Sequence, residues 1–318
     1  MKKILVGAAI GAIALAGVAA AAPANALACG TSALLVNGPS DTANQLTWFS
    51  PTGTVLETVP MGESQGYGDI ALSKDALTVF GVQNTDPGDP AGDVVDLVDA
   101  ATGSVKSTLT MTGPAAGIGG WDGAAIRPDG KLIVGSNASE KVFTVDTATG
   151  ASTEFFDYTT LTSVESAYTT GDFVTLDNGD EIALGTLNDG SSDLYAVIRI
   201  HPDGTGIILG SVENSWGAGR VGDDLQLAGS DGVIRQIALA DLPIVEGFDP
   251  LTTTTVVDTG DLGSLWGAAG TKDAGTQECV TLPDTGLNNG TALTVGLIAA
   301  GLGIAGAASI VIARRKRA

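Results

Sequence analysis

Short apolar runs alternate with short polar turns between residues 30 and 281, without any long stretch of helical periodicity. Alternation of period two, bounded by Gly, Asp, Asn and Pro, predicts β-strands. Four stretches share one form, an apolar run, a polar turn closing on glycine and a second run: TWFSPTGTVLETVP, DLVDAATGSVKSTLT, FTVDTATGASTEFF and IRIHPDGTGIILGS. Because glycine adopts the left-handed conformation of such turns without strain, each stretch predicts a strand pair.

These strand pairs recur at a nearly constant interval. The turn glycines lie 50, 47 and 54 residues apart, at Gly53, Gly103, Gly150 and Gly204. A second strand–turn–strand piece recurs in each unit, as in YGDIALSKDALTVFGVQ and WDGAAIRPDGKLIVGSN. Four strands in a unit of about 50 residues are typical of a β-propeller blade, and a β-sandwich would not require such a repeat. The sequence therefore predicts an all-β propeller.

The number of blades follows from the predicted inner strands, which begin near Tyr67, Trp121, Gly171, Trp216 and Trp266. The last of these has no further strands after it, whereas the N-terminal pieces SALLVNG, QLTWFS and TVLETVP lack an inner strand. One blade built from both ends would close the ring and remove its exposed edges. We expect five blades with a split blade; six is the alternative because residues 157–170 and 242–251 fit no predicted strand.

Both ends of the chain carry targeting signals. Residues 1–28 contain two lysines, an apolar stretch and a final Ala-Leu-Ala, which predict a secretory signal peptide cleaved before Cys29. A retained anchor helix and a lipoprotein signal are the alternatives.

Residues 292–313 are a 22-residue run without charge, which is long enough for a transmembrane helix. Residues 314–317 are all basic, which keeps them on the cytoplasmic side. A plain single-span anchor and a glycolipid-anchor signal are the alternatives here.

The segment before this apolar run distinguishes these possibilities. Its residues are Leu282, Pro283, Asp284, Thr285 and Gly286. Followed by an apolar span and a basic tail, this LPDTG resembles the sortase sorting signal of Gram-positive surface proteins. The resemblance implies cleavage after Thr285 by sortase and covalent attachment of Thr285 to peptidoglycan. The protein would then be extracellular and wall-anchored, with only transient membrane contact, and would comprise a propeller at 29–281 and a sorting signal at 282–318.

Charge and cysteine content refine this prediction. The chain has 36 acidic and 15 basic residues, and six basic residues lie in the segments that processing removes, so nine remain and the mature net charge is −27. This balance excludes ordinary nucleic-acid binding. It favours solubility of an exposed surface, with calcium binding as the alternative.

Cys29 and Cys279 would meet in the split blade, which predicts a disulfide; free thiols are the alternative.

The turns VDAATG and VDTATG, together with PDGKLIVGSN, resemble YVTN-type bacterial propeller repeats. This resemblance implies blade geometry and does not imply an activity.

Three carboxylates are candidates for a channel site because Asp69, Asp122 and Asp172 lie near the starts of inner strands. They could converge on a ligand or on a cation such as calcium. Propeller lactonases of the gluconolactonase type use carboxylate and amide ligands in this way. Hydrogen-bonded strand ends are the alternative, and Gly217 and Gly267 leave any ring of charge incomplete.

Four aromatic residues occupy a similar position, namely Tyr67, Trp121, Trp216 and Trp266. They could stack on a sugar or another ligand at the channel, or fill the space between blades. His201, the single histidine, lies in a predicted outer turn, where a structural role is favoured over catalysis.

The leading functional prediction is a secreted, wall-anchored binding or interaction module for an extracellular ligand that the sequence does not name. The alternatives are a wall-bound hydrolase or lactonase with a divalent cation in the channel, and a structural wall protein. No catalytic residue is predicted.

Overall fold

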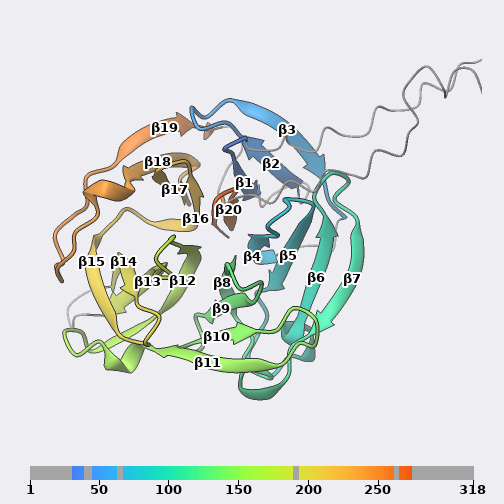
Figure 1. Ribbon diagram of the computed structural model, residues 1–318, viewed down its shortest axis with the longest axis horizontal. Coiled ribbons are helices and arrows are strands. Elements are labelled where there is room, and N and C mark those ends of the chain that lie inside the picture. The colour runs from blue at the N-terminus through green and yellow to red at the C-terminus, as the bar shows by residue number, and fades with distance from the viewer. Residues whose placement is uncertain (1–30, 39–44, 63–66, 189–192, 261–264, 274–318) are drawn as a thin grey trace, which may run out of the picture. The chain divides into compact units, whose positions relative to one another are not determined.

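Five four-stranded antiparallel sheets surround a common centre as the blades of a β-propeller (Figure 1). The computed structural model describes residues 31–38, 45–62, 67–188, 193–260 and 265–273. The chain divides into two units, 1–278 and 279–318, and all described residues belong to the first. The predictions for the signal peptide, Cys29, Cys279, the LPDTG segment and the apolar span fall outside the described residues. None of the helices within the described ranges is long and apolar enough to cross a membrane.

The strands follow the predicted blade order. Blade 1 contains β20 (Ala268–Gly270), β1 (Leu34–Asn37), β2 (Gln45–Phe49) and β3 (Val55–Pro60). Blade 2 contains β4 (Tyr67–Leu72), β5 (Thr78–Gln83), β6 (Val94–Asp99) and β7 (Val105–Thr110). Blade 3 contains β8 (Trp121–Ile126), β9 (Leu132–Ser136), β10 (Lys141–Val145) and β11 (Ser152–Asp157).

The remaining two blades complete the ring. Blade 4 contains β12 (Ser166–Thr175), β13 (Glu181–Asn188), β14 (Asp193–Ile200) and β15 (Gly206–Ser211). Blade 5 contains β16 (Ser215–Val221), β17 (Asp224–Gly229), β18 (Val233–Ala238) and β19 (Thr254–Asp258). Short 3₁₀ helices in the described connections are η1 (Pro90–Asp93), η2 (Gly113–Ala115), η3 (Tyr158–Thr160) and η4 (Leu239–Asp241).

The five-blade count and the split blade are confirmed. β20 pairs with β1 in antiparallel register, with Ala269 opposite Leu35, and the two strands lie side by side at the centre of the ring (Figure 1). The hydroxyl Oγ1 of Thr271 accepts the backbone N–H of Ala33 at 3.0 Å, across 238 positions of sequence. Backbone pairing between the two ends of the described chain therefore completes blade 1 and closes the ring.

The predicted turn glycines are also confirmed, because Gly53, Gly103, Gly150 and Gly204 all have φ between 67° and 80°. Two of them show a further reason for glycine. A β-carbon at Gly103 would collide with the carbonyl oxygen of Pro60, and one at Gly150 would collide with that of Thr110. These turns pack directly on the outermost strand of the preceding blade, so glycine serves both the turn and the contact between blades.

The two unassigned segments do not add a blade. Residues 157–170 form η3 and the beginning of β12, which starts at Ser166 and not near Gly171 as predicted. A bulge between Thr169 and Phe173 lengthens this strand and displaces its start. Residues 239–253 connect β18 to β19, and their backbone runs along β15, where Ser211 pairs with Pro250. The segment therefore covers the edge strand of blade 4.

The apolar core lies between the blades. Each cluster of buried side chains that the described residues form joins two neighbouring blades; Leu34 and Phe49 of blade 1, for example, pack with Val221 and Ile234 of blade 5. Burying one such side chain stabilises a protein by about 1.5–3 kcal/mol. The ring is thus stabilised by apolar interfaces between blades. The starts of the inner strands surround its centre.

Candidate functional site

The inner strands share a bulge that determines which side chains reach the centre. β4, β8 and β16 each contain one extra residue relative to the strand they pair with, at Gly68, Asp122 and Trp216. Because one extra residue redirects the side chains of a strand, the bulge residue and the next residue point to different places. Asp69 follows the bulge whereas Asp122 is the bulge itself. Asp122 and Asp69 therefore lie near the starts of their strands, as predicted, but differ by one position in register.

Asp69 and Asp172 form a buried carboxyl pair at the centre of the ring, with 0% and 1% of their surfaces exposed. Asp69 accepts the backbone N–H of Ala124 in blade 3 at 2.8 Å. Asp172 accepts those of Ala218 in blade 5 at 3.0 Å and Ala268 in blade 1 at 3.3 Å. Since the two carboxyls themselves belong to blades 2 and 4, the pair connects the inner strands of all five blades.

A shared proton makes this pair possible. Burial raises the pKa of both carboxyls well above the usual range, because an isolated charge is poorly solvated in the interior. A hydrogen bond joins the Asp69 and Asp172 carboxyls, and the negative charge of the pair raises the pKa of Asp172 further. A side chain at Gly267 would collide with Asp69, which explains why that position carries no third carboxylate. The pair therefore has a structural role, because it joins the inner strands at the centre of the ring.

Asp122 lies instead at the open mouth of the channel, between two amides. Asn84, directly after β5, donates its side-chain N–H to one carboxylate oxygen, and Asn137, directly after β9, donates to the other. Burial raises the pKa of Asp122 to about 6, while the two hydrogen bonds act in the opposite direction. At neutral pH Asp122 is therefore a carboxylate in a fixed orientation.

These residues line a hollow of about 470 Å³, which we call the channel-mouth pocket. Its volume lies within the range typical of small-ligand sites, about 300–1,000 Å³. The residues around it come from every blade and are Gly68, Asn84, Asp122, Asn137, Tyr168, Thr170, Thr186, Tyr195, Trp216 and Trp266.

The four predicted aromatic residues divide into two groups. Tyr67 and Trp121 are buried between blades, where the Trp121 Nε1–H donates to the carbonyl of Gly92 at 2.7 Å. Trp216 and Trp266 are partly exposed in the channel-mouth pocket, and their ring centroids lie 4.7 Å apart at an interplanar angle of 39°. Packing between blades accounts for the first pair, and the second pair faces the hollow.

Among the predicted candidates, Asp122, Trp216 and Trp266 meet in the pocket, whereas Asp69, Asp172 and Trp121 do not line it. The sequence analysis did not identify the pocket residues Asn84, Asn137, Tyr168, Thr170, Thr186 and Tyr195. A signal for the two asparagines was present, because LLVN, GVQN and VGSN each place an asparagine at the end of the second strand of a blade or directly after it. The residues from blade 4 carry no such signal, since the irregular bulge of β12 disturbs its register.

A shared cation site is not formed by the three aspartates. Within the described ranges, no group of three or more His, Cys, Asp or Glu side chains is placed to hold one metal ion. The Asp69 and Asp172 oxygens accept backbone N–H groups. Calcium binding by this protein remains a prediction from its acidic composition.

His201 occupies an outer turn, as predicted, between β14 and β15. Its Nδ1 lies 2.9 Å from Oδ1 of Asp180, in the turn before β13. Neither residue belongs to the lining of the channel-mouth pocket.

The opposite ends of the inner strands carry another set of buried charges. Arg127, after β8, pairs with Glu181 at 2.8 Å. Asp273, after β20, accepts the backbone N–H of Arg220 at 2.5 Å. Burial raises the pKa of Glu181 to about 7 and that of Asp273 to about 8. Both values lie within the physiological pH range, so a change of pH is expected to alter the charge at this end of the channel.

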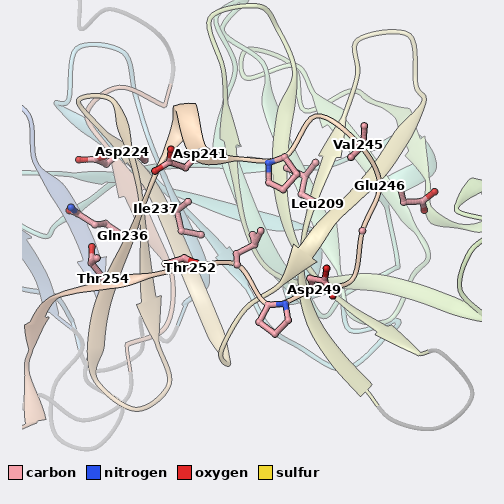
Figure 2. Close-up of a pocket in the computed structure, with 15 residues that line it drawn as sticks. Leu209, Asp224, Gln236, Ile237, Asp241, Val245, Glu246, Asp249, Thr252 and Thr254 are labelled. Atoms are coloured by element: carbon pink, nitrogen blue, oxygen red, sulfur yellow. The ribbon is translucent and has the colours of Figure 1, made fainter.

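A second hollow, of about 830 Å³, lies on the outside of the ring (Figure 2). The 239–253 segment covers it, and Ile244 and Val245 of this segment are 81% and 69% exposed. Leu209 and Ile237 give it an apolar side, and its charged side chains are Asp224, Asp241, Glu246 and Asp249 (Figure 2). It is an acidic surface groove formed by blades 4 and 5 alone.

No protein-family model matches this sequence, and no curated protein does. Solved structures that resemble the fold include a chain of a nidogen–laminin complex, with 12% identity, a TM-score of 0.47, and coverage of 77% of this chain and 100% of that one. A virginiamycin B lyase from Staphylococcus aureus matches with 14% identity, a TM-score of 0.35 and coverage of 61% of both chains. An auxiliary nutrient-binding protein from Bacteroides thetaiotaomicron matches with 12% identity, a TM-score of 0.42 and coverage of 71% and 57%. At these values, no function is carried over from them.

Proposed function

We propose that this protein is a cell-surface binding module, a secreted β-propeller attached to peptidoglycan through Thr285, with its ligand at the channel-mouth pocket. The observation that carries the proposal is the composition of this pocket. It is concave, it combines two partly exposed tryptophans with a fixed carboxylate and two amides, and all five blades contribute to it. Concave sites with an aromatic part and a few oriented polar groups are typical of ligand binding.

Binding is favoured over hydrolysis by what accompanies Asp122. Among the described residues that line the pocket, Asp122 is the one carboxylate, and none is a histidine, cysteine, serine or lysine. The hydroxyls of two tyrosines and two threonines in this lining therefore have no histidine or second carboxylate there to act as their base. Acid–base or nucleophilic catalysis needs at least two groups in hydrogen-bonding reach of the reacting atoms. Asn84 and Asn137 orient the Asp122 carboxylate but cannot exchange a proton with a substrate at neutral pH.

Wall attachment is supported by the sequence of the C-terminal segment. LPDTG at 282–286, the uncharged run at 292–313 and the basic residues at 314–317 follow one another in the order of a sortase sorting signal. The partners implied are sortase and peptidoglycan, and the location implied is the outer face of the cell wall.

The attachment can be tested by muramidase digestion of cell walls, followed by mass spectrometry of the released protein. We expect a C-terminal peptide ending at Thr285 and carrying the mass of a wall peptide. A Thr285→Ala variant is the matched control and should be missing from the wall fraction. A released protein that continues to Ala318 would overturn the attachment.

The binding site can be tested with three chemically different probes: neutral oligosaccharides, choline and trialanine. We expect at least one of them to raise the melting temperature of the protein, and Trp216→Ala to abolish that rise. A rise that persists in Trp216→Ala, or no rise with any probe, would contradict a ligand site at the channel mouth.

A further inference from the structure

We infer that the channel-mouth pocket binds a neutral saccharide. The ligand class rests on the proposed function, which supplies the site without naming what it binds. Three properties of the pocket support a saccharide: its aromatic surface, its polar groups and its charge.

The two tryptophans of the pocket form a stack, while Tyr168 and Tyr195 of blade 4 line the pocket separately from this stack. Trp216 and Trp266 come from neighbouring blades, and their centroid distance of 4.7 Å and angle of 39° mean that each ring covers part of the other. What remains is one apolar surface formed by both indoles. A pyranose ring presents a face of C–H groups that packs on such a surface. A quaternary ammonium ion is instead held by several ring faces turned toward it.

The polar groups match adjacent hydroxyls. Each oxygen of Asp122 accepts one amide N–H, from Asn84 on one side and Asn137 on the other. Each amide keeps its oxygen and a second N–H, and each carboxylate oxygen keeps further acceptor capacity. Neighbouring sugar hydroxyls both donate and accept, so they can bind a carboxylate–amide pair in two directions. Thr186 adds a hydroxyl, which donates to Thr170 at 3.0 Å.

The two kinds of surface come from different parts of the ring. Asn84, Asp122 and Asn137 belong to blades 2 and 3, whereas Trp216 and Trp266 belong to blades 5 and 1. A ligand between them therefore meets an aromatic surface on one side and hydrogen-bonding groups on the other. A sugar ring has this division, with apolar faces and a polar edge.

The charge of the pocket excludes anionic ligands. None of its described lining residues is Lys, Arg or His, and Asp122 is ionised at neutral pH. A phosphate or a uronic acid would face this carboxylate without a compensating cation, in a chain that is itself strongly acidic. The neutral members of the saccharide class fit the site.

The experiment is isothermal titration calorimetry of the mature protein with glycans chosen from an array of neutral oligosaccharides, including glucose and N-acetylglucosamine oligomers. We expect at least one glycan to bind. We expect Trp216→Ala and, separately, Asn84→Ala to weaken its binding at least tenfold. Asn84 is exposed, so its variant keeps the test valid if Trp216→Ala fails to fold. Val245→Ala, on the outer groove, is the matched control and should bind normally.

Each other outcome overturns a distinct statement. Choline or trialanine binding that is lost in Trp216→Ala, with no neutral glycan binding, would overturn the saccharide class and leave the proposed site in place. Glycan binding that is unchanged in both pocket variants would place the sugar elsewhere and overturn the inference. No binding of any probe would overturn both the inference and the proposed site.

Discussion

Asp172 and Asp122 are both aspartates near the start of an inner strand, yet they have opposite relations to solvent. Asp172 is enclosed, is hydrogen-bonded to Asp69 in a pair whose pKa values burial raises, and accepts backbone N–H groups from two other blades. Asp122 is partly exposed, ionised at neutral pH and held by two side-chain amides at the edge of a hollow. Asp122 is the extra residue of a one-residue bulge in β8, whereas Asp172 lies at the end of a longer irregularity in β12, directly before the paired residue Phe173. This difference in local register separates a group that stabilises the ring from a group at the edge of the pocket. The following predictions test that separation.

The largest effect is expected for Asp172→Ala. Removing this carboxyl leaves the buried N–H groups of Ala218 and Ala268 without an acceptor and deprives Asp69 of its donor. We expect a loss of about 3–5 kcal/mol in the free energy of unfolding, measured by urea denaturation. Asp172→Asn keeps an acceptor and a donor and should lose much less. Equal losses in the two variants would contradict the role of the shared proton.

The next effect is a decrease of stability with rising pH. Burial raises the pKa of Asp122 to about 6, of Glu181 to about 7 and of Asp273 to about 8. A carboxyl whose pKa is raised in the folded protein stabilises the folded state fully at pH values below its pKa in the unfolded chain, which is about 4. This stabilisation is lost as the pH rises to the pKa that the carboxyl has in the folded protein. Carboxyls whose pKa is lowered in the folded protein, such as Asp146, change the stability only at pH values below the pKa of the unfolded chain. Stability should therefore fall between pH 5 and pH 9.

We expect this fall to amount to several kcal/mol, because each pKa unit above pH 5 corresponds to about 1.4 kcal/mol, and it is measured by urea denaturation at each pH. The titration is done at 0.5 M salt, so that repulsion between surface carboxylates is screened while the buried groups are not. Asp273→Asn should flatten the profile near pH 8. A profile that rises over this interval, or one that Asp273→Asn leaves unchanged, would contradict the assignment.

A smaller effect, with two parts of opposite sign, is expected for Asp122→Asn. Burial raises the pKa of the Asp122 carboxyl, which means that its charged form is less stable in the folded protein than in water. Because the substitution removes this charge, the melting temperature should stay the same or rise slightly. It also removes an ionic acceptor from the pocket, so the affinity for the saccharide should fall at least tenfold, or about 1.4 kcal/mol. Loss of stability together with normal affinity would show that Asp122 resembles Asp172 after all.

The smallest effect is expected for His201→Ala. Its pair with Asp180 lies in outer turns, and the imidazole is about one-third exposed. Such pairs contribute at most about 1 kcal/mol. We expect a change of this size in urea denaturation and an unchanged glycan affinity. A glycan affinity that falls with this variant would connect the outer turn to the pocket and remove the contrast between the two regions.

The fold could be predicted from the sequence because its signals are local. Alternating apolar residues mark each strand, and a glycine that needs a left-handed conformation marks the turn at Gly53, Gly103, Gly150 and Gly204. The unmatched strands at the two ends were enough to predict the split blade. The start of β12 was placed incorrectly because its irregular bulge breaks the alternation on which such predictions depend.

The candidate site could be predicted only in part. Asp122, Trp216 and Trp266 were identified by their position in the repeat, but so were Asp69, Asp172 and Trp121, which serve the interior. The residues from blade 4 were missed because the irregular bulge of β12 breaks the alternation that would have placed them beside Asp122.

The sequence by itself determined the strands, the glycine turns, the number of blades and the way the ring closes, because each depends on residues that are near one another in the chain or repeat at a fixed interval. Only the tertiary structure decided which aspartate is buried and which lines the channel-mouth pocket. A bulge shifts a side chain from one face of a strand to the other, and the change from a protonated bridge to an ionised carboxylate follows from the groups that neighbouring blades bring against it.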